Sequence, residues 1–77
     1  MEVGDKVTIN PQGTNIPKSW EGRELTGTVL SIPNDGTIAV EVDNGDKAGH
    51  NFGITVASPT ISSENGWWFA ESELSEA

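Results

Sequence analysis

The sequence predicts an all-β domain, a small five-stranded barrel with long loops. Apolar residues alternate with polar residues over short stretches, and no segment sustains the apolar period of about 3.6 residues that marks a helix. Glycine and proline interrupt these stretches at intervals typical of short strands. A small open sheet exposes two edges, and closure into a barrel protects them. We expect residues 1–77 to form a single domain.

The first strand is predicted at residues 5–10, where Val7 and Ile9 point to the same side. A proline follows and ends the strand, because proline donates no hydrogen bond to a neighbouring strand. Residues 11–24 then form a long loop that contains Trp20. We expect this tryptophan to pack over the small core as a lid.

The second strand is predicted at residues 25–32, with Val29 and Ile32 in the core. Gly27 lies in mid-strand, which indicates a bend or a close approach of another backbone. The apolar alternation is irregular, which indicates a β-bulge near Leu30.

A turn at residues 33–36, Pro-Asn-Asp-Gly, joins this strand to a third strand at residues 37–43. The two strands are therefore expected to form an antiparallel hairpin. The third strand alternates cleanly, with Ile38, Val40 and Val42 predicted to point inward and Ala39 and Glu41 predicted to point outward.

Residues 44–65 form a long segment rich in glycine, serine, asparagine and threonine. Ile54 and Val56 alternate within it and indicate a short strand. Unstructured segments of this length are uncommon in compact domains and are often functional.

The last main strand is predicted at residues 66–70. Residues 71–74 suit a single helical turn that places Leu74 against the end of the barrel. We expect residues 75–77 to form a fraying tail.

Trp67 and Trp68 are adjacent, so they point to opposite faces of their strand. Trp67 shares a face with Phe69, which is a predicted core residue, so we place Trp67 inside and Trp68 outside. Two interpretations of Trp68 remain open. It is either covered, by residues 44–65 or by Trp20, or it is exposed as an anchor for a partner.

The chain is strongly acidic, with 12 Asp and Glu against four Lys and Arg and a formal charge of −8. Such a surface repels phosphate, so direct binding of DNA or RNA and contact with an anionic membrane are disfavoured. The charge either keeps the protein soluble or complements a basic surface on a protein partner. The candidate binding residues are the aromatic residues and the acids of the second half: Trp68, Trp20, His50, Phe52, Glu41, Asp43, Asp46, Glu71 and Glu73.

The sequence predicts no catalytic, cofactor or metal site. The chain has no cysteine and one histidine, His50, so zinc would need mainly carboxylate ligands. The run 43–46 lacks the spacing and the terminal glutamate of a calcium-binding loop. No serine can be placed beside His50, and no glycine-rich loop leads into a helix N-terminus that would hold phosphate.

The sequence predicts a monomeric, cytoplasmic protein. No apolar run approaches the ~20 residues that span a bilayer. The first residues lack the basic and apolar regions of a secretory signal. The absence of cysteine fits a reducing compartment.

Gly4-Asp5-Lys6-Val7, Gly27-Thr28-Val29 and the third strand together resemble small barrels of the Src-homology-3-like class, including KOW-type modules. The second half, with Gly49-His50-Asn51 and Gly66-Trp67-Trp68-Phe69 followed by Leu74, resembles the mind-bomb-type repeat and similar small phage-encoded proteins. Phe52 and Phe69 depart from that pattern, in which smaller or aliphatic residues are usual. The best-known members of that family bind peptide segments of partner proteins.

Trp67-Trp68-Phe69-Ala70 also matches the "Trp-Trp-x-Ala" of true Src-homology-3 domains, which bind proline-rich ligands. The tyrosines that line such grooves are missing, because the chain contains no tyrosine. The resemblances therefore imply a protein-binding module of the phage accessory or regulatory type. It would act on a basic surface of a host or viral protein, for example to inhibit nucleic-acid machinery in the host cytoplasm. The alternatives are a KOW-like nucleic-acid-associated module and a structural subunit of a larger complex.

Overall fold

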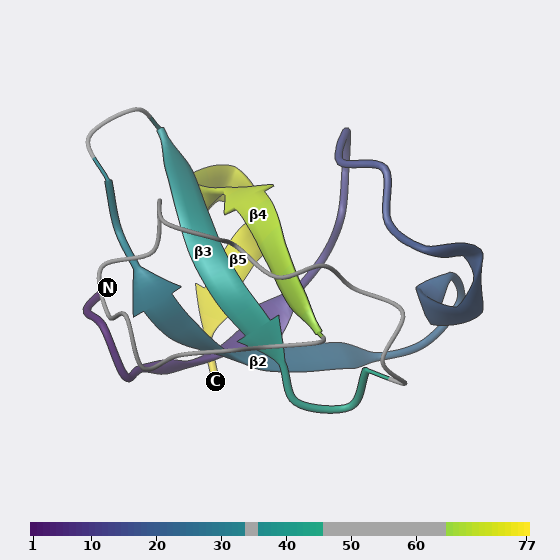
Figure 1. The fold of residues 1–77 in the computed structure, drawn as a ribbon, viewed down its shortest axis with the longest axis horizontal. Helices are drawn as coiled ribbons and strands as arrows, with labels where there is room; N and C mark the ends of the chain where they lie inside the picture. The colour runs from purple at the N-terminus through teal and green to yellow at the C-terminus, as the bar shows by residue number, and fades with distance from the viewer. Residues whose placement is uncertain (34–35, 46–64) are drawn as a thin grey trace.

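The computed structural model describes residues 1–33, 36–45 and 65–77, and it confirms the predicted all-β class. These residues form one five-stranded antiparallel sheet with the strand order β4-β3-β2-β1-β5 (Figure 1). The strands are β1 (Lys6–Ile9), β2 (Leu25–Ser31), β3 (Thr37–Val42), β4 (Gly66–Ala70) and β5 (Leu74–Glu76). Two 3₁₀ turns, η1 (Lys18–Trp20) and η3 (Glu71–Glu73), complete the regular structure of the described residues.

The sheet is curled, because its two edge strands follow each other in the chain. β4 and β5 lie at opposite edges, and only the three residues of η3 join them (Figure 1). Five strands laid flat would separate the edge strands by about 19 Å, whereas a 3₁₀ connection of this length spans only about 8 Å. The edges do not pair with each other, so the sheet is not closed and the predicted barrel is not confirmed.

The inner face of the curled sheet holds the core. Its largest member is Trp20, which η1 brings onto the core and which has no exposed surface. The loop tryptophan thus covers the core as predicted. The buried residues of this cluster are Val7, Ile9, Trp20, Leu25, Val29, Ile38, Val40, Val42, Phe69 and Leu74.

The predicted bulge in β2 is present, because the register between β2 and β3 shifts between Val29 and Ser31. The shift places Ser31 on the buried side and leaves Ile32 39% exposed, so the prediction that Ile32 is a core residue is wrong. The close approach predicted at Gly27 is also present. A Cβ atom there would lie 2.5 Å from Cγ1 of Val40 and 2.7 Å from the carbonyl oxygen of Glu41.

The predicted fraying tail is wrong, because residues 74–76 form β5. This strand pairs antiparallel with β1, and the N–H of Ala77 donates to the carbonyl of Lys6 at 3.1 Å. The free edge of β1 supplies the partner groups, which no local pattern in the tail could reveal. The predicted turn before it is confirmed as η3, and it delivers Leu74 to the core.

Two predictions about secondary structure fall outside the described residues: the short strand at Ile54 and Val56, and the conformation of Asn34 and Asp35 in the turn. Gly36, which follows that pair, has a φ of 86°. This left-handed conformation favours glycine, as the predicted turn requires.

Candidate functional site

The strongest candidate for a binding surface is the outer face of the sheet, which we define as the face opposite the core. Directly opposed residues on neighbouring antiparallel strands point to the same side. Lys6 of β1 lies opposite Thr28 of β2, Thr28 lies opposite Glu41 of β3, and Glu41 lies opposite Gly66 of β4. These four residues form one row across four strands of the outer face.

The next row of the outer face is apolar. Ala39 of β3 lies opposite Trp68 of β4, and both pack together with Leu30 of the β2 bulge. Trp68 and Leu30 are half-buried, while Ala39 is fully buried. The outer face therefore presents a partly accessible tryptophan on a small apolar base.

Trp67 lies on the inner face, as the sequence predicts. It packs against the main core, and its ring meets that of Trp20 edge to face, with centroids 5.6 Å apart and an interplanar angle of 68°. Adjacent tryptophans thus belong to two different clusters on the two faces of β4.

Glu41 is an acid of the outer face, on the strand that neighbours Trp68. Glu41 is half-buried, and its carboxylate forms no hydrogen bond or ion pair with any other residue that the structure describes. Trp68 is its diagonal neighbour, and in such pairs the Cβ atoms lie somewhat less than about 7–8 Å apart. The residue directly opposite Glu41 on β4 is Gly66, which contributes no side chain.

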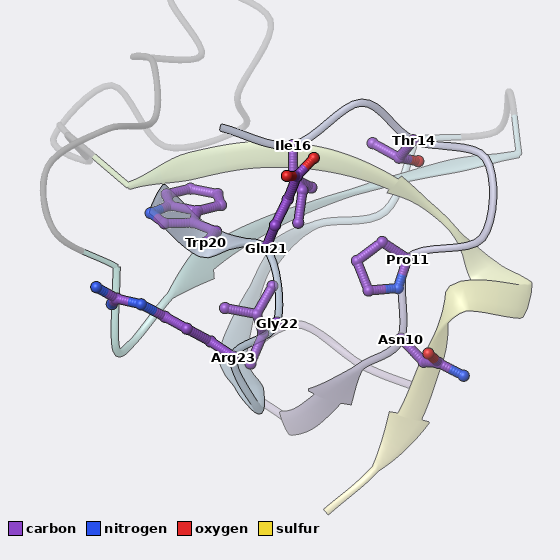
Figure 2. Close-up of a pocket in the computed structure, with 9 residues that line it drawn as sticks. Asn10, Pro11, Thr14, Ile16, Trp20, Glu21, Gly22 and Arg23 are labelled. Atoms are coloured by element: carbon purple, nitrogen blue, oxygen red, sulfur yellow. The ribbon is translucent and has the colours of Figure 1, made fainter. Parts of the chain in front are cut away.

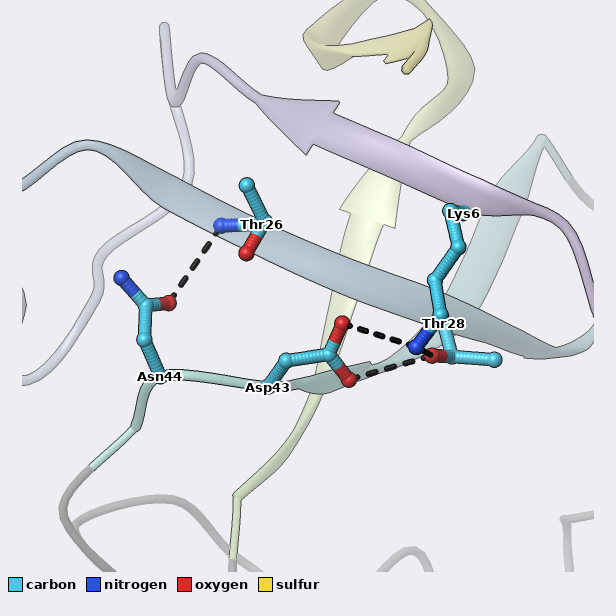
Figure 3. A network of polar contacts seen from close by, with 5 residues as sticks. All are labelled: Lys6, Thr26, Thr28, Asp43 and Asn44. Carbon is cyan, nitrogen blue, oxygen red and sulfur yellow. Dashed lines mark hydrogen bonds and ion pairs between the residues drawn. The ribbon is translucent and has the colours of Figure 1, made fainter.

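Asp43, in contrast, is neutralised within the chain (Figure 3). Nζ of Lys6 lies 3.2 Å from Oδ2 of Asp43 and donates to Oγ1 of Thr28 at 2.8 Å. Thr28 Oγ1 in turn donates to Oδ1 of Asp43 at 3.1 Å. Next to this group, Oδ1 of Asn44 accepts the N–H of Thr26 at 3.3 Å. Asp43 therefore adds less to the negative field of the outer face than Glu41 does.

The structure does not bring Trp20 and Trp68 together, although the sequence groups them as one binding region. Trp20 is fully buried on the core side, so it cannot serve as a surface contact in this conformation. The sequence around a loop tryptophan does not show whether its side chain packs inward or outward, because tertiary contacts decide this.

Glu73, another predicted interface acid, is a structural residue. The residue is 4% exposed, and its side chain binds the loop that follows β1. Oε2 accepts the N–H groups of Gln12, Gly13 and Thr14 at 2.7, 3.3 and 3.3 Å. Oε1 accepts the hydroxyl of Thr14 at 2.5 Å and the N–H of Ala70 at 2.9 Å.

These contacts change the acidity of Glu73. Burial by itself raises the pKa of this carboxyl, but the hydrogen bonds from Thr14, Ala70, Gln12 and Gly13 favour the charged form. They lower its pKa from 4.5 to about 2. Glu73 is therefore a buried anion held by donors of its own chain, and it is not available to a partner.

Of the other predicted residues, Glu71 is exposed in η3, while His50, Phe52 and Asp46 lie outside the described residues. Within residues 1–33, 36–45 and 65–77, no group of three or more histidines, cysteines, aspartates or glutamates is placed to hold a metal ion. The same part of the chain contains no helix that is long and apolar enough to cross a membrane.

Sequence reasoning missed an open groove of about 360 Å³ beside the loop after β1 (Figure 2). Its lining includes Pro11, Ile16, Glu21 and Arg23. Arg23 extends away from the loop, and its guanidinium donates to the carbonyl of Asn44 at 3.1 Å. The spacing of apolar residues in this loop follows no strand or helix period, so the sequence carried no signal for the groove.

No protein-family model, curated protein or solved structure matches the chain.

Proposed function

We propose that the protein is a small acidic protein-binding module that acts on a basic surface of a partner through its outer face. One observation carries the proposal: the half-buried Trp68 lies on the outer face beside Glu41, an acid that the described residues leave unpaired. Half-buried tryptophans are frequent anchors of protein interfaces, and an unpaired acid beside one selects a positively charged partner.

The overall charge supports the same partner class. A formal charge of −8 attracts basic surfaces at long range and accelerates their encounter, while it repels nucleic acid. Among the described residues, Glu21, Glu24 and Glu71 add further exposed negative charge. The narrower version is a phage-type accessory or regulatory protein that occupies a basic site on nucleic-acid machinery and inhibits it. That version rests on the resemblance of the chain to small phage-encoded barrels.

The resemblance also leads us to propose the Src-homology-3-like barrel as the complete architecture. The strong curl of the sheet and the short η3 connection between its edges support it. A crystal or solution structure would test directly whether the edge strands β4 and β5 close the sheet.

Salt dependence of binding tests the proposed function. The probe is a fluorescently labelled peptide of about 20 residues that alternates glycine with lysine and arginine, and an acidic peptide of equal length is the control. We expect binding of the basic peptide to weaken about ten-fold between about 50 mM and 500 mM NaCl, and no binding of the acidic peptide. Absence of binding to the basic peptide, or an affinity that salt leaves unchanged, would contradict the proposal.

The rival nucleic-acid function is tested with the same fluorescence measurement. Labelled DNA and RNA of similar length should give no change in anisotropy at physiological salt. Affinity capture from the native cell, followed by mass spectrometry, would then identify the partner.

A further inference from the structure

We infer that Glu41 and Trp68 together form a recognition site for one arginine side chain of the partner. This inference rests on the proposed function and names the chemical group that its central contact takes. The guanidinium would lie against the indole of Trp68 and donate hydrogen bonds to the carboxylate of Glu41.

The register places the two groups at a suitable separation. Glu41 and Trp68 lie on neighbouring strands of the outer face, and their positions are two residue pairs apart along the β3–β4 ladder. The Cβ atoms of such diagonal pairs lie somewhat less than about 7–8 Å apart, so one planar guanidinium is able to contact the ring and the carboxylate together. No side chain on Gly66 competes for the position opposite Glu41.

Among residues 1–33, 36–45 and 65–77, no cation pairs with the carboxylate of Glu41. Lys6 lies in the same row but is two strands away, and it binds Asp43 and Thr28 instead. Arg23 donates to the carbonyl of Asn44. One acid of the outer face is thus neutralised internally, and the acid beside the tryptophan is left for an external cation.

Arginine fits this site better than lysine does. Its guanidinium is planar, so it stacks on an aromatic ring and can donate two parallel hydrogen bonds to a carboxylate. It is also less strongly hydrated than an ammonium group, so transfer onto the half-buried ring of Trp68 costs less.

The test uses a ten-residue peptide that alternates glycine with arginine, and a glycine–lysine peptide of equal length. Binding to the ¹⁵N-labelled protein is followed by NMR, which resolves one indole N–H signal for each of the three tryptophans. Trp68→Phe identifies the Trp68 signal by its loss. We expect the arginine peptide to shift this signal while the signal of the buried Trp20 stays in place, and the lysine peptide to bind about three-fold more weakly.

Matched variants separate the site from the general charge effect. Glu41→Gln and Glu24→Gln each remove one negative charge, and Glu24 is an exposed residue that immediately precedes β2. We expect Glu41→Gln to weaken binding of the arginine peptide about five-fold and Glu24→Gln to weaken it less than two-fold. Trp68→Leu should also weaken binding about five-fold, whereas Trp68→Phe, which keeps an aromatic face, should retain most of it.

The outcomes distinguish the site from the proposed function. Equal losses for Glu41→Gln and Glu24→Gln, or an unmoved Trp68 signal, would overturn the arginine site while salt-dependent binding to basic peptides still stood. Absence of binding to both peptides would overturn the proposed function and the site together. The dispersion of the NMR spectrum shows whether each variant is folded, and Glu41→Gln decides the matter if Trp68→Leu does not fold.

Discussion

Thr14 and Glu73 lie 59 residues apart in the sequence and are joined by two hydrogen bonds. The hydroxyl of Thr14 donates to one carboxylate oxygen of Glu73, and its N–H donates to the other. Because Glu73 ends η3 and Thr14 lies in the loop after β1, this contact ties the loop to the connection between the two edge strands. Thr14 also lines the groove, so the same contact sets the position of one wall of the groove.

Glu73→Gln should lower the free energy of unfolding by about 2–3 kcal/mol. Both carboxylate oxygens of Glu73 accept hydrogen bonds, whereas the glutamine amide has one accepting oxygen, and its NH₂ group would face N–H and O–H donors. Urea denaturation followed by tryptophan fluorescence measures the change. Glu71→Gln is the matched control. It removes the same charge from an exposed position in the same turn, and we expect an effect within about 0.5 kcal/mol.

Acid should destabilise the protein through Glu73. Its pKa is about 2 in the folded protein against 4.5 ordinarily, so the unfolded chain binds the proton more readily. Stability from this group is complete above pH 4.5 and is lost as the pH falls toward 2, by about 3 kcal/mol in total. Urea denaturation at a series of pH values should show this loss, and Glu73→Gln should lack it. An identical pH dependence in the two proteins would contradict the assignment.

Substitution of Trp20, on the inner face of the sheet, should reduce stability more than substitution of Trp68, on the outer face. Trp20 is fully buried in the core, so Trp20→Ala should cost about 3–5 kcal/mol. Trp68 is half-buried on a small apolar base, and Trp68→Ala should cost only about 1–2 kcal/mol. Thermal unfolding by circular dichroism measures both variants. If Trp68→Ala lost more stability than about 1–2 kcal/mol and matched Trp20→Ala, Trp68 would be a core residue and its assignment to an accessible surface would be wrong.

Gly27→Ala should destabilise the protein by about 2–3 kcal/mol, because the new methyl group would overlap Val40 and the backbone of Glu41. Gly13→Ala is the control, since a Cβ there meets no atom within 4 Å. We expect that variant to change the free energy of unfolding by less than about 1 kcal/mol. Urea midpoints of the two variants make the comparison.

The strands with local patterns were predictable from the sequence, and the features that depend on distant contacts were not. Alternation and turn chemistry correctly identify β1 to β4, the bulge near Leu30 and the opposite facing of Trp67 and Trp68. β5 is only three residues long and exists because β1 offers it a free edge. A local pattern cannot show that edge.

The candidate site was predictable only in part, for the same reason. Trp68 and Glu41 follow from strand alternation, and the structure places them on one face. Packing of Trp20 on the core was predictable, although its grouping with the binding residues was not compatible with full burial. Glu73 is a surface residue by type, yet backbone donors enclose it. Burial of a charged residue depends on donors that another part of the chain supplies, and the residue's own neighbours in sequence do not encode them.

The pairing of β1 with β5 has a kinetic consequence. β2 and β3 are neighbours in sequence and can associate early, whereas Ile9 must find Leu74 across almost the whole chain. Closing so long a loop is entropically costly, and contacts of this kind form late on the folding pathway. Substitutions in β5 or at Glu73 should therefore accelerate unfolding and leave the folding rate almost unchanged. The pairing of β5 with β1 would then slow unfolding, and the lifetime of the folded protein would depend on this pairing.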